Sequence, residues 1–152
     1  MNHQEPKLNK SRRRLPHWER NGATYFVTFR LLKGVLTDAE CQHVLDHLIA
    51  GDGVFYRLLA GVVMPDHVHL LIRPKTGYEL SRVMKGIKGV SARLVSQSRG
   101  ATGSLWQDES HDRIMRDEDE AIEKARYILD NPRRAGLVDN PLDYPFQHAA
   151  VF

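Results

Sequence analysis

Two apolar runs, at 54–64 and 67–73, are separated only by Pro65 and Asp66, and this pattern most restricts how the chain can fold. Each run has the length of a strand and too few residues to cross a bilayer. Proline followed by aspartate favours a tight turn. The two runs therefore predict a β-hairpin, and the mostly apolar first run predicts a strand that is buried on both faces.

The segment before this hairpin predicts a strand and then a helix. Residues 23–31 are rich in aromatic and β-branched side chains, which favour a strand. Thr37 and Glu40 have the spacing of a capping box, which predicts a helix from Thr37 to about residue 50.

The segment after the hairpin predicts a helix, a strand and a second helix. Apolar residues recur at three- and four-residue spacing across 79–95, as in an amphipathic helix, and the polar segment 96–104 predicts a loop. Residues 111–116 predict a short strand. A last helix is expected at 117–130, ended by the Asn-Pro pair at 131–132.

The order of the first six elements is that of the ferredoxin-like split pattern. The predicted fold class is therefore α+β: an antiparallel ferredoxin-like sheet with helices on one face, plus a C-terminal helix that carries a tyrosine. A length of 152 residues suits one domain. We expect this domain at 21–140, after a basic arm at 1–20 and before a tail at 141–152.

Amino-acid composition further narrows the class of protein and its compartment. Hydrophobic residues make up 41% and charged residues 27% of the chain, which are values of a globular protein. The single cysteine, Cys41, excludes an intramolecular disulfide and favours a reducing compartment. No apolar signal segment is present at the N-terminus. We expect a cytoplasmic protein that does not associate with membranes.

Basic residues gather on the arm and on the polar side of the helix at 79–95. The arm has six basic residues against two acidic ones, which favours a polyanion, although a solvated terminus is an equally good interpretation. An exposed tryptophan can also stack on a base, although core packing is the commoner role of this residue. The candidate DNA-contacting residues are Arg12, Arg13, Arg14, Arg82, Lys85, Lys88, Arg93, Trp106 and Gln107.

Two histidines stand two residues apart in the second strand of the hairpin. Side chains alternate along a strand, so His67 and His69 point to one face and Val68 to the other. Two imidazoles on one strand form half of a divalent-metal site. The spacing alone favours two polar residues on an exposed face instead. Their apolar neighbours favour the metal site, because a buried polar group needs a partner.

The last helix carries a candidate nucleophile and a further candidate ligand. Tyr127 and Asn131 are spaced i, i+4 and share one helix face. A phenol close to its phenolate form can attack a phosphodiester, and a metal on the phosphate oxygens neutralises the developing charge. The plain alternatives are an aromatic packing residue for Tyr127 and a helix C-cap for Asn131.

These motifs resemble those of a known family. Residues 62–71, VVMPDHVHLL, are similar to the histidine–hydrophobic–histidine (HUH) motif of single-tyrosine transposases, and residues 126–138, RYILDNPRRAGLV, resemble their tyrosine helix. More narrowly, the chain resembles the REP-associated tyrosine transposases from about 14 to 138. Smaller matches are LPHW at 15–18, the strand at 25–30, SAR at 91–93 and LWQ at 105–107.

The resemblance implies an activity and a set of roles. His67, His69 and Asn131 would bind Mg2+ or Mn2+, and Tyr127 would attack single-stranded DNA beside a palindromic repeat hairpin. The products would be a 5′-phosphotyrosine and a free 3′-OH, and a second strand could reverse the step without a nucleotide cofactor. Many insertion-sequence members have glutamine where Asn131 stands. The resemblance also implies a bacterial, nucleoid-associated protein, with a monomer slightly favoured over a dimer.

Three hypotheses about function follow. The first is a metal-dependent enzyme of DNA strand transfer, based on the histidine pair and on the pair of Tyr127 and Asn131. The second is a non-catalytic DNA hairpin-binding protein that retains the fold, which the same basic residues support. The third is a metal-dependent phosphodiesterase in which water attacks in place of the tyrosine.

Overall fold

A computed structural model of the chain describes residues 22–150, and its first seven elements have the predicted order. The predicted α+β class is confirmed. The expected DNA contacts Arg12, Arg13 and Arg14 lie outside the described residues, as does the arm at 1–20. The elements are β1 (Tyr25–Arg30), α2 (Asp38–Gly51), β2 (Tyr56–Val63), β3 (His67–Pro74), α3 (Leu80–Arg99), β4 (His111–Ile114), α4 (Glu118–Arg134), η1 (Pro141–Asp143) and β5 (Gln147–Ala149).

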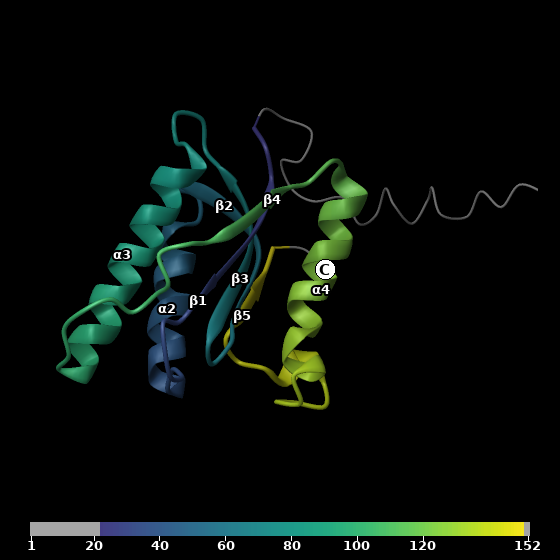
Figure 1. The fold of residues 1–152 in the computed structure, drawn as a ribbon. Helices are drawn as coiled ribbons and strands as arrows, with labels where there is room; N and C mark the ends of the chain where they lie inside the picture. Colours follow the sequence, from purple (N-terminus) through teal and green to yellow (C-terminus); the bar gives the residue numbers. More distant parts are fainter. Residues whose placement is uncertain (1–21, 151–152) are drawn as a thin grey trace, which may run out of the picture.

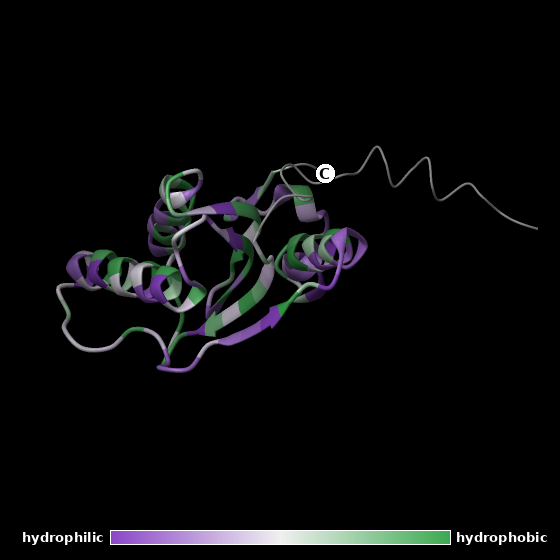
Figure 2. Ribbon diagram, turned by 90° about the horizontal axis from the view of Figure 1, so that it is seen from above, coloured by the Kyte–Doolittle hydropathy of each residue, from purple (hydrophilic) through white to green (hydrophobic). Residues whose placement is uncertain are grey.

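The strands form one antiparallel sheet in the order β4-β1-β3-β2-β5, with β3 at its centre. Helices α2 and α3 cover one face of this sheet, and α4 lies on the opposite face (Figure 1). Seen from above, the greener, more hydrophobic sides of the helices turn toward the sheet (Figure 2). None of the helices within 22–150 is long and apolar enough to cross a membrane.

Helices α2 and α3 are joined by an ion pair that the sequence did not predict. The capping box at the start of α2 is present, because the Glu40 N–H donates to Thr37 Oγ1 and the Thr37 N–H donates to Glu40 Oε1. Arg99 also donates to Glu40 through Nε, at 2.5 Å, and through Nη2. This guanidinium holds the pKa of the Glu40 carboxyl below its usual value.

Helix α3 extends into the segment that was predicted to be a loop at 96–104. It continues to Arg99 and ends at Gly100, which has a left-handed φ of 65°. No proline or glycine interrupts 96–99, and Arg99 is held by its ion pair to α2. The predicted end at residue 95 was therefore too early, because the apolar period stops one turn before the helix does.

Helix α4 likewise continues past its predicted end at 130. Pro132 lies inside its last turn and is buried, and the helix runs to Arg134. The Leu137 N–H donates to the Pro132 carbonyl and the Gly136 N–H to the Arg133 carbonyl, the two bonds of a Schellman motif. Gly136 supplies the left-handed residue that this motif needs, with φ of 78°. Asn131 is therefore inside the helix, and its interpretation as a C-cap is wrong.

The segment predicted as a tail, 141–152, adds an edge strand to the sheet. Its strand β5 pairs with β2 in antiparallel register. Tyr144 anchors the segment, because its buried hydroxyl donates to the Val63 carbonyl at 2.6 Å. Burial raises the pKa of this phenol. A strand of three residues is too short to show a period, which explains why the sequence pattern did not reveal it.

The close packing of α2 on β2 leads to a stability prediction. A Cβ atom added to Gly51 would lie 2.5 Å from the Tyr56 Oη atom, and that buried hydroxyl donates to the Leu48 carbonyl. We expect Gly51→Ala to lower the free energy of unfolding by about 1–3 kcal/mol, measured by denaturant titration. Gly86→Ala is the control: Gly86 lies within α3 with open space around it, so alanine should stabilise by about 1 kcal/mol. Equal losses in the two variants would contradict this account.

Candidate active site

The two histidines of β3 share the face of the sheet that α4 covers. Their ring centroids are 4.6 Å apart. His69 is buried, with 5% of its surface exposed, and His67 is half-buried. Val68 between them is fully buried and pairs with Phe29, whose ring packs on Trp106 in the layer of α3. The predicted alternation along this strand is therefore confirmed.

Each imidazole forms a hydrogen bond through its Nδ1 atom to a neighbouring side chain. The Thr28 Oγ1 atom lies 2.8 Å from His69 Nδ1, because the register of β1 and β3 places these two residues opposite each other. Asp66 in the hairpin turn places its Oδ1 atom 2.7 Å from His67 Nδ1. Oxygen atoms that accept from Nδ1–H leave the Nε2 lone pairs for another ligand. Histidines that bind metal commonly have this arrangement.

Burial keeps the His69 imidazole uncharged. It lowers the pKa of His69 to about 3, and the nearby positive groups His67, Arg30 and Lys124 lower the pKa in the same direction. A neutral imidazole has a free lone pair, whereas a protonated one has none. His69 can therefore donate to a metal ion at neutral pH without first losing a proton.

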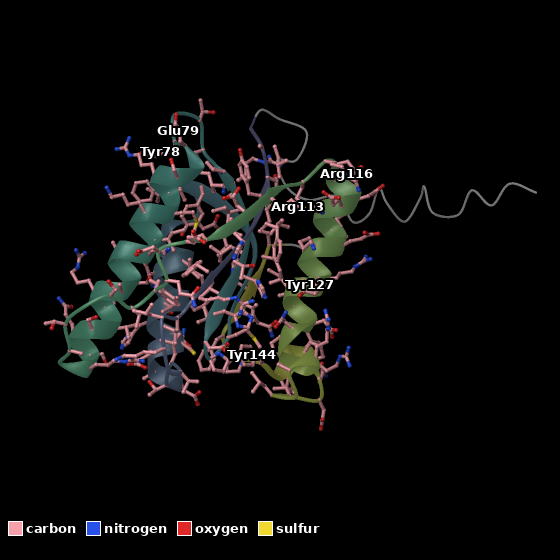
Figure 3. All side chains as sticks on the ribbon, viewed as in Figure 1. Tyr78, Glu79, Arg113, Arg116, Tyr127 and Tyr144 are labelled. Carbon is pink, nitrogen blue, oxygen red and sulfur yellow. The ribbon has the colours of Figure 1, made fainter. Side chains whose placement is uncertain are left out.

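Helix α4 places Tyr127 beside this pair. The Tyr127 ring centroid lies 6.0 Å from that of His69 and 6.2 Å from that of Phe26. Phe26 also stacks on His69, with 5.4 Å between the centroids. Tyr127 is 37% exposed and lies midway along α4, whereas Tyr78 lies in the layer of α3 (Figure 3). A substrate in solution can therefore approach the Tyr127 side chain.

Two cations that the sequence analysis missed contact the Tyr127 ring. The Lys124 Nζ atom lies 5.0 Å and the Arg134 Cζ atom 4.8 Å from its centroid. The Lys124 Nζ atom is also 4.6 Å from the centroid of Phe26. The spacing of Lys124, Tyr127 and Arg134 along α4 places them on one side of the helix, and that signal could have identified them.

Asn131 lies one helical turn beyond Tyr127 on the same side of α4 and is half-buried. Helix α4 and strand β3 run in opposite directions (Figure 1). Along α4, Asn131 therefore lies nearer than Tyr127 to the end of β3 that carries His67. The carboxamide has an oxygen that can serve as a third ligand.

These donors fit a divalent ion with open coordination positions. Within 22–150 there is no group of three or more histidine, cysteine, aspartate or glutamate side chains that could hold a metal. Two imidazoles and one carboxamide would leave positions for phosphate oxygens and water. Mg2+ strongly prefers oxygen ligands, so the two nitrogens favour Mn2+ over Mg2+.

The predicted DNA contacts of α3 lie away from this site. Helix α3 covers the sheet face opposite to α4 (Figure 1). Arg82, Lys85 and Arg93 are exposed there, and the Arg82 guanidinium packs on the Tyr78 ring. Lys88 instead has a structural role, because its Nζ atom donates to the carbonyls of Gln107 and Asp108. Burial lowers the pKa of Lys88, and Asp108 opposes this effect.

Trp106 is not an exposed stacking residue, which corrects the sequence prediction. Its side chain is 5% exposed and packs edge-on against Phe29, with 4.7 Å between the ring centroids. The indole N–H donates to Ser91 Oγ at 2.9 Å. A base cannot stack on a ring that the core covers. Gln107 is exposed, and its amide donates to the Leu31 carbonyl.

Comparison with known families decides what kind of protein this is. The sequence model of the family described as "Transposase IS200 like" matches residues 31–130, which is more than half of the chain. The chain belongs to the IS200-like transposase family. The family expected from the histidine motif and the tyrosine helix is thus confirmed. No curated protein sequence matches the chain.

Two solved structures share the fold of this transposase. A REP-associated tyrosine transposase bound to a REP hairpin has a TM-score of 0.66 at 22% identity, covering 88% of this chain and 82% of the other. A candidate transposase from Deinococcus radiodurans R1 has a TM-score of 0.52 at 23% identity, covering 72% of this chain and 90% of the other. The ferredoxin-like sheet with its additional helix is therefore an arrangement that other transposases share.

The buried His69 makes stability depend on pH. Unfolded His69 takes up a proton below pH 6.5, whereas the folded residue does so only near its pKa of about 3. The unfolded state therefore binds more protons between these values, and stability falls as the pH falls. We expect the free energy of unfolding to drop by about 1.4 kcal/mol per pH unit more in the wild type than in His69→Gln. Parallel pH profiles from denaturant titrations would contradict a neutral, buried His69.

Proposed function

We propose that this transposase cleaves and rejoins single-stranded DNA through a covalent link to Tyr127, with a divalent metal bound by His67, His69 and Asn131. The observation that carries the proposal is the position of the partly exposed Tyr127 ring, 6.0 Å from the ring of His69. Membership of the transposase family and the HUH motif on β3 support the same reaction. Tyr127 lies beside the His69 of its own chain, which supports action within a monomer.

The proposed step exchanges one phosphoester bond for another. The Tyr127 phenol loses its proton, and its oxygen attacks the phosphorus, forming a P–O bond to tyrosine while the bond from phosphorus to the 3′-oxygen breaks. The 3′-oxygen takes up a proton and leaves as a free 3′-OH. A 3′-OH from a second strand can attack the phosphotyrosine and restore a phosphodiester. The bond energy is retained, so no nucleotide triphosphate is required.

The chain's own residues prepare the site for this step. Thr28 and Asp66 hold the two imidazoles through their Nδ1 atoms, which leaves both Nε2 atoms free for a ligand. Phe26 packs against the rings of His69 and Tyr127 and sets their separation. A divalent metal bound here would supply Lewis-acid stabilisation of charge on the phosphate oxygens.

The proposed substrate is single-stranded DNA beside a hairpin formed by a palindromic repeat. A structural relative was solved with a REP hairpin, and this chain shares its fold. The exposed residues Arg82, Lys85 and Arg93 of α3 offer positive charge to a phosphate backbone. Because they lie in the layer opposite to Tyr127, we propose that they hold a part of the DNA distant from the reacting bond.

Removal of the proposed nucleophile tests this function. We expect wild-type protein, incubated with a labelled hairpin oligonucleotide and Mn2+, to form an adduct that survives denaturing electrophoresis. Tyr127→Phe should form none, because a phenyl ring has no oxygen to attack phosphorus. Tyr78→Phe is the matched control: Tyr78 is also partly exposed but lies in the other layer, and its adduct yield should equal that of the wild type.

The same assay separates the alternatives. Cleavage that persists in Tyr127→Phe without any adduct would support a phosphodiesterase in which water attacks. Tight hairpin binding by the wild type, with neither adduct nor cleavage, would support a non-catalytic hairpin-binding protein and contradict the proposed reaction.

Removal of the proposed ligands tests the metal. We expect His67→Ala to bind Mn2+ at least about 10-fold more weakly in calorimetric titration and to lose adduct formation, as chelation of the metal does in the wild type. Asn131→Gln should retain activity because it keeps the carboxamide, whereas Asn131→Ala should lose activity. His43→Ala, on the exposed side of α2, is the control and should bind Mn2+ like the wild type. Undiminished Mn2+ affinity in His67→Ala would contradict the assignment.

A further inference from the structure

Two cations lie against the Tyr127 ring, and neither is in direct contact with a carboxylate of the described residues. Lys124 is half-buried, and its ammonium rests on the rings of Phe26 and Tyr127. The Arg134 guanidinium lies against the same Tyr127 ring. Within 22–150, neither cation forms an ion pair with a carboxylate. A half-buried ammonium without a counterion is costly, which suggests that an anion binds there during function.

Three other cations on or beside α4, namely Arg133, Arg113 and Arg116, are paired with acids. Arg133 forms a bidentate pair with Asp130, with both distances 2.7 Å. Arg113 and Arg116 both pair with Glu120 at the start of the helix. Lys124 and Arg134 differ from these residues in being held by an aromatic ring instead of a carboxylate. Asp130 also attracts the Arg134 guanidinium, but both of its carboxylate oxygens are bonded to Arg133, so the N–H groups of Arg134 and the ammonium of Lys124 stay available to a ligand that reaches Tyr127.

The geometry favours a phosphate group as that ligand. Lys124 comes from the turn before Tyr127 and Arg134 from two turns after it, so the two cations bracket the hydroxyl-bearing ring along the helix. A lysine acts on phosphate as a compact point charge, and an arginine can bind two phosphate oxygens through its planar fork. With their charged groups 5.0 and 4.8 Å from the ring centroid, these flexible side chains can reach the oxygens of a phosphate bound beside the Tyr127 ring.

We propose that Lys124 and Arg134 form a phosphate clamp that binds the non-bridging oxygens of the phosphodiester facing Tyr127. This inference rests on the proposed function for the identity of the substrate, single-stranded DNA. The clamp holds the phosphate from the side of α4, while His67 and His69 face it from the side of β3. It positions the phosphorus for attack and stabilises the negative charge that grows on its oxygens in the transition state.

The test measures phosphate contact separately from cleavage. Binding of a short single-stranded oligothymidylate is measured by fluorescence anisotropy at several salt concentrations without divalent metal. All variants are made in a Tyr127→Phe background, which cannot form an adduct by the proposed chemistry. Lys124→Met and Arg134→Gln remove one charge each while keeping much of the side chain. Arg126→Gln is the matched control, because it removes the same charge from an exposed position of α4.

We expect Lys124→Met and Arg134→Gln each to weaken binding about 10-fold and to reduce the slope of log affinity against log salt by about 0.7. Lys124→Arg should preserve the slope. Arg126→Gln should change both the affinity and the slope less than Lys124→Met and Arg134→Gln do. With Tyr127 restored, Lys124→Met should slow adduct formation by about 100-fold at saturating protein. Thermal melts check that each variant is folded.

The two readouts separate the inference from the function on which it rests. Salt slopes of Lys124→Met and Arg134→Gln equal to that of the Arg126→Gln control would overturn the clamp, whatever the adduct assay shows. Reduced slopes in a protein that forms no adduct would support the clamp as a phosphate-binding site while contradicting the covalent reaction.

Discussion

Strand β3 runs through the centre of the sheet with both faces covered, and its two histidines must therefore be satisfied inside the protein. His69 meets this requirement by staying neutral and by hydrogen bonding to Thr28, which lies opposite it on β1. The pairing depends on register, because a shift by one residue would turn both histidines toward the apolar layer of α2 and α3. The register of β1 against β3 is thus the constraint on which the candidate active site depends.

Helix α4 completes the site from the opposite side. Its buried face, which includes Ala125 and Ile128, packs on the sheet, and this contact sets how far Tyr127 lies from His69. The extra turn through Pro132 matters to function as well as to stability. A helix that ended at 130 would leave Asn131 and Arg134 in a loop, whereas the Schellman motif at Gly136 keeps both on the side of the helix that carries Tyr127.

The cations proposed to contact DNA lie in two groups on opposite layers of the molecule (Figure 1). Lys124 and Arg134 surround Tyr127, while Arg82, Lys85 and Arg93 lie on α3 beyond the sheet. A sheet with helices on both sides separates these groups. A nucleic acid that contacts both must therefore pass around an edge of the sheet, and three of the four residues of edge strand β4 are polar.

The order of the first seven elements and the family could be predicted from the amino-acid sequence, because hydrophobic periods, the capping box at Thr37 and the two motifs are local patterns. The sequence also determined that His67 and His69 share a face, since a strand alternates its side chains. Only the tertiary structure decided what lies across from them. Thr28 and Trp106 take their places through contacts between segments that are far apart in the sequence, and Arg134 joins Lys124 at the site because α4 continues past residue 130. Strand β5 is likewise defined by its partner β2 and not by its own three residues. Local patterns in the sequence indicate the direction of a side chain, but the packing of distant segments determines which residues it contacts.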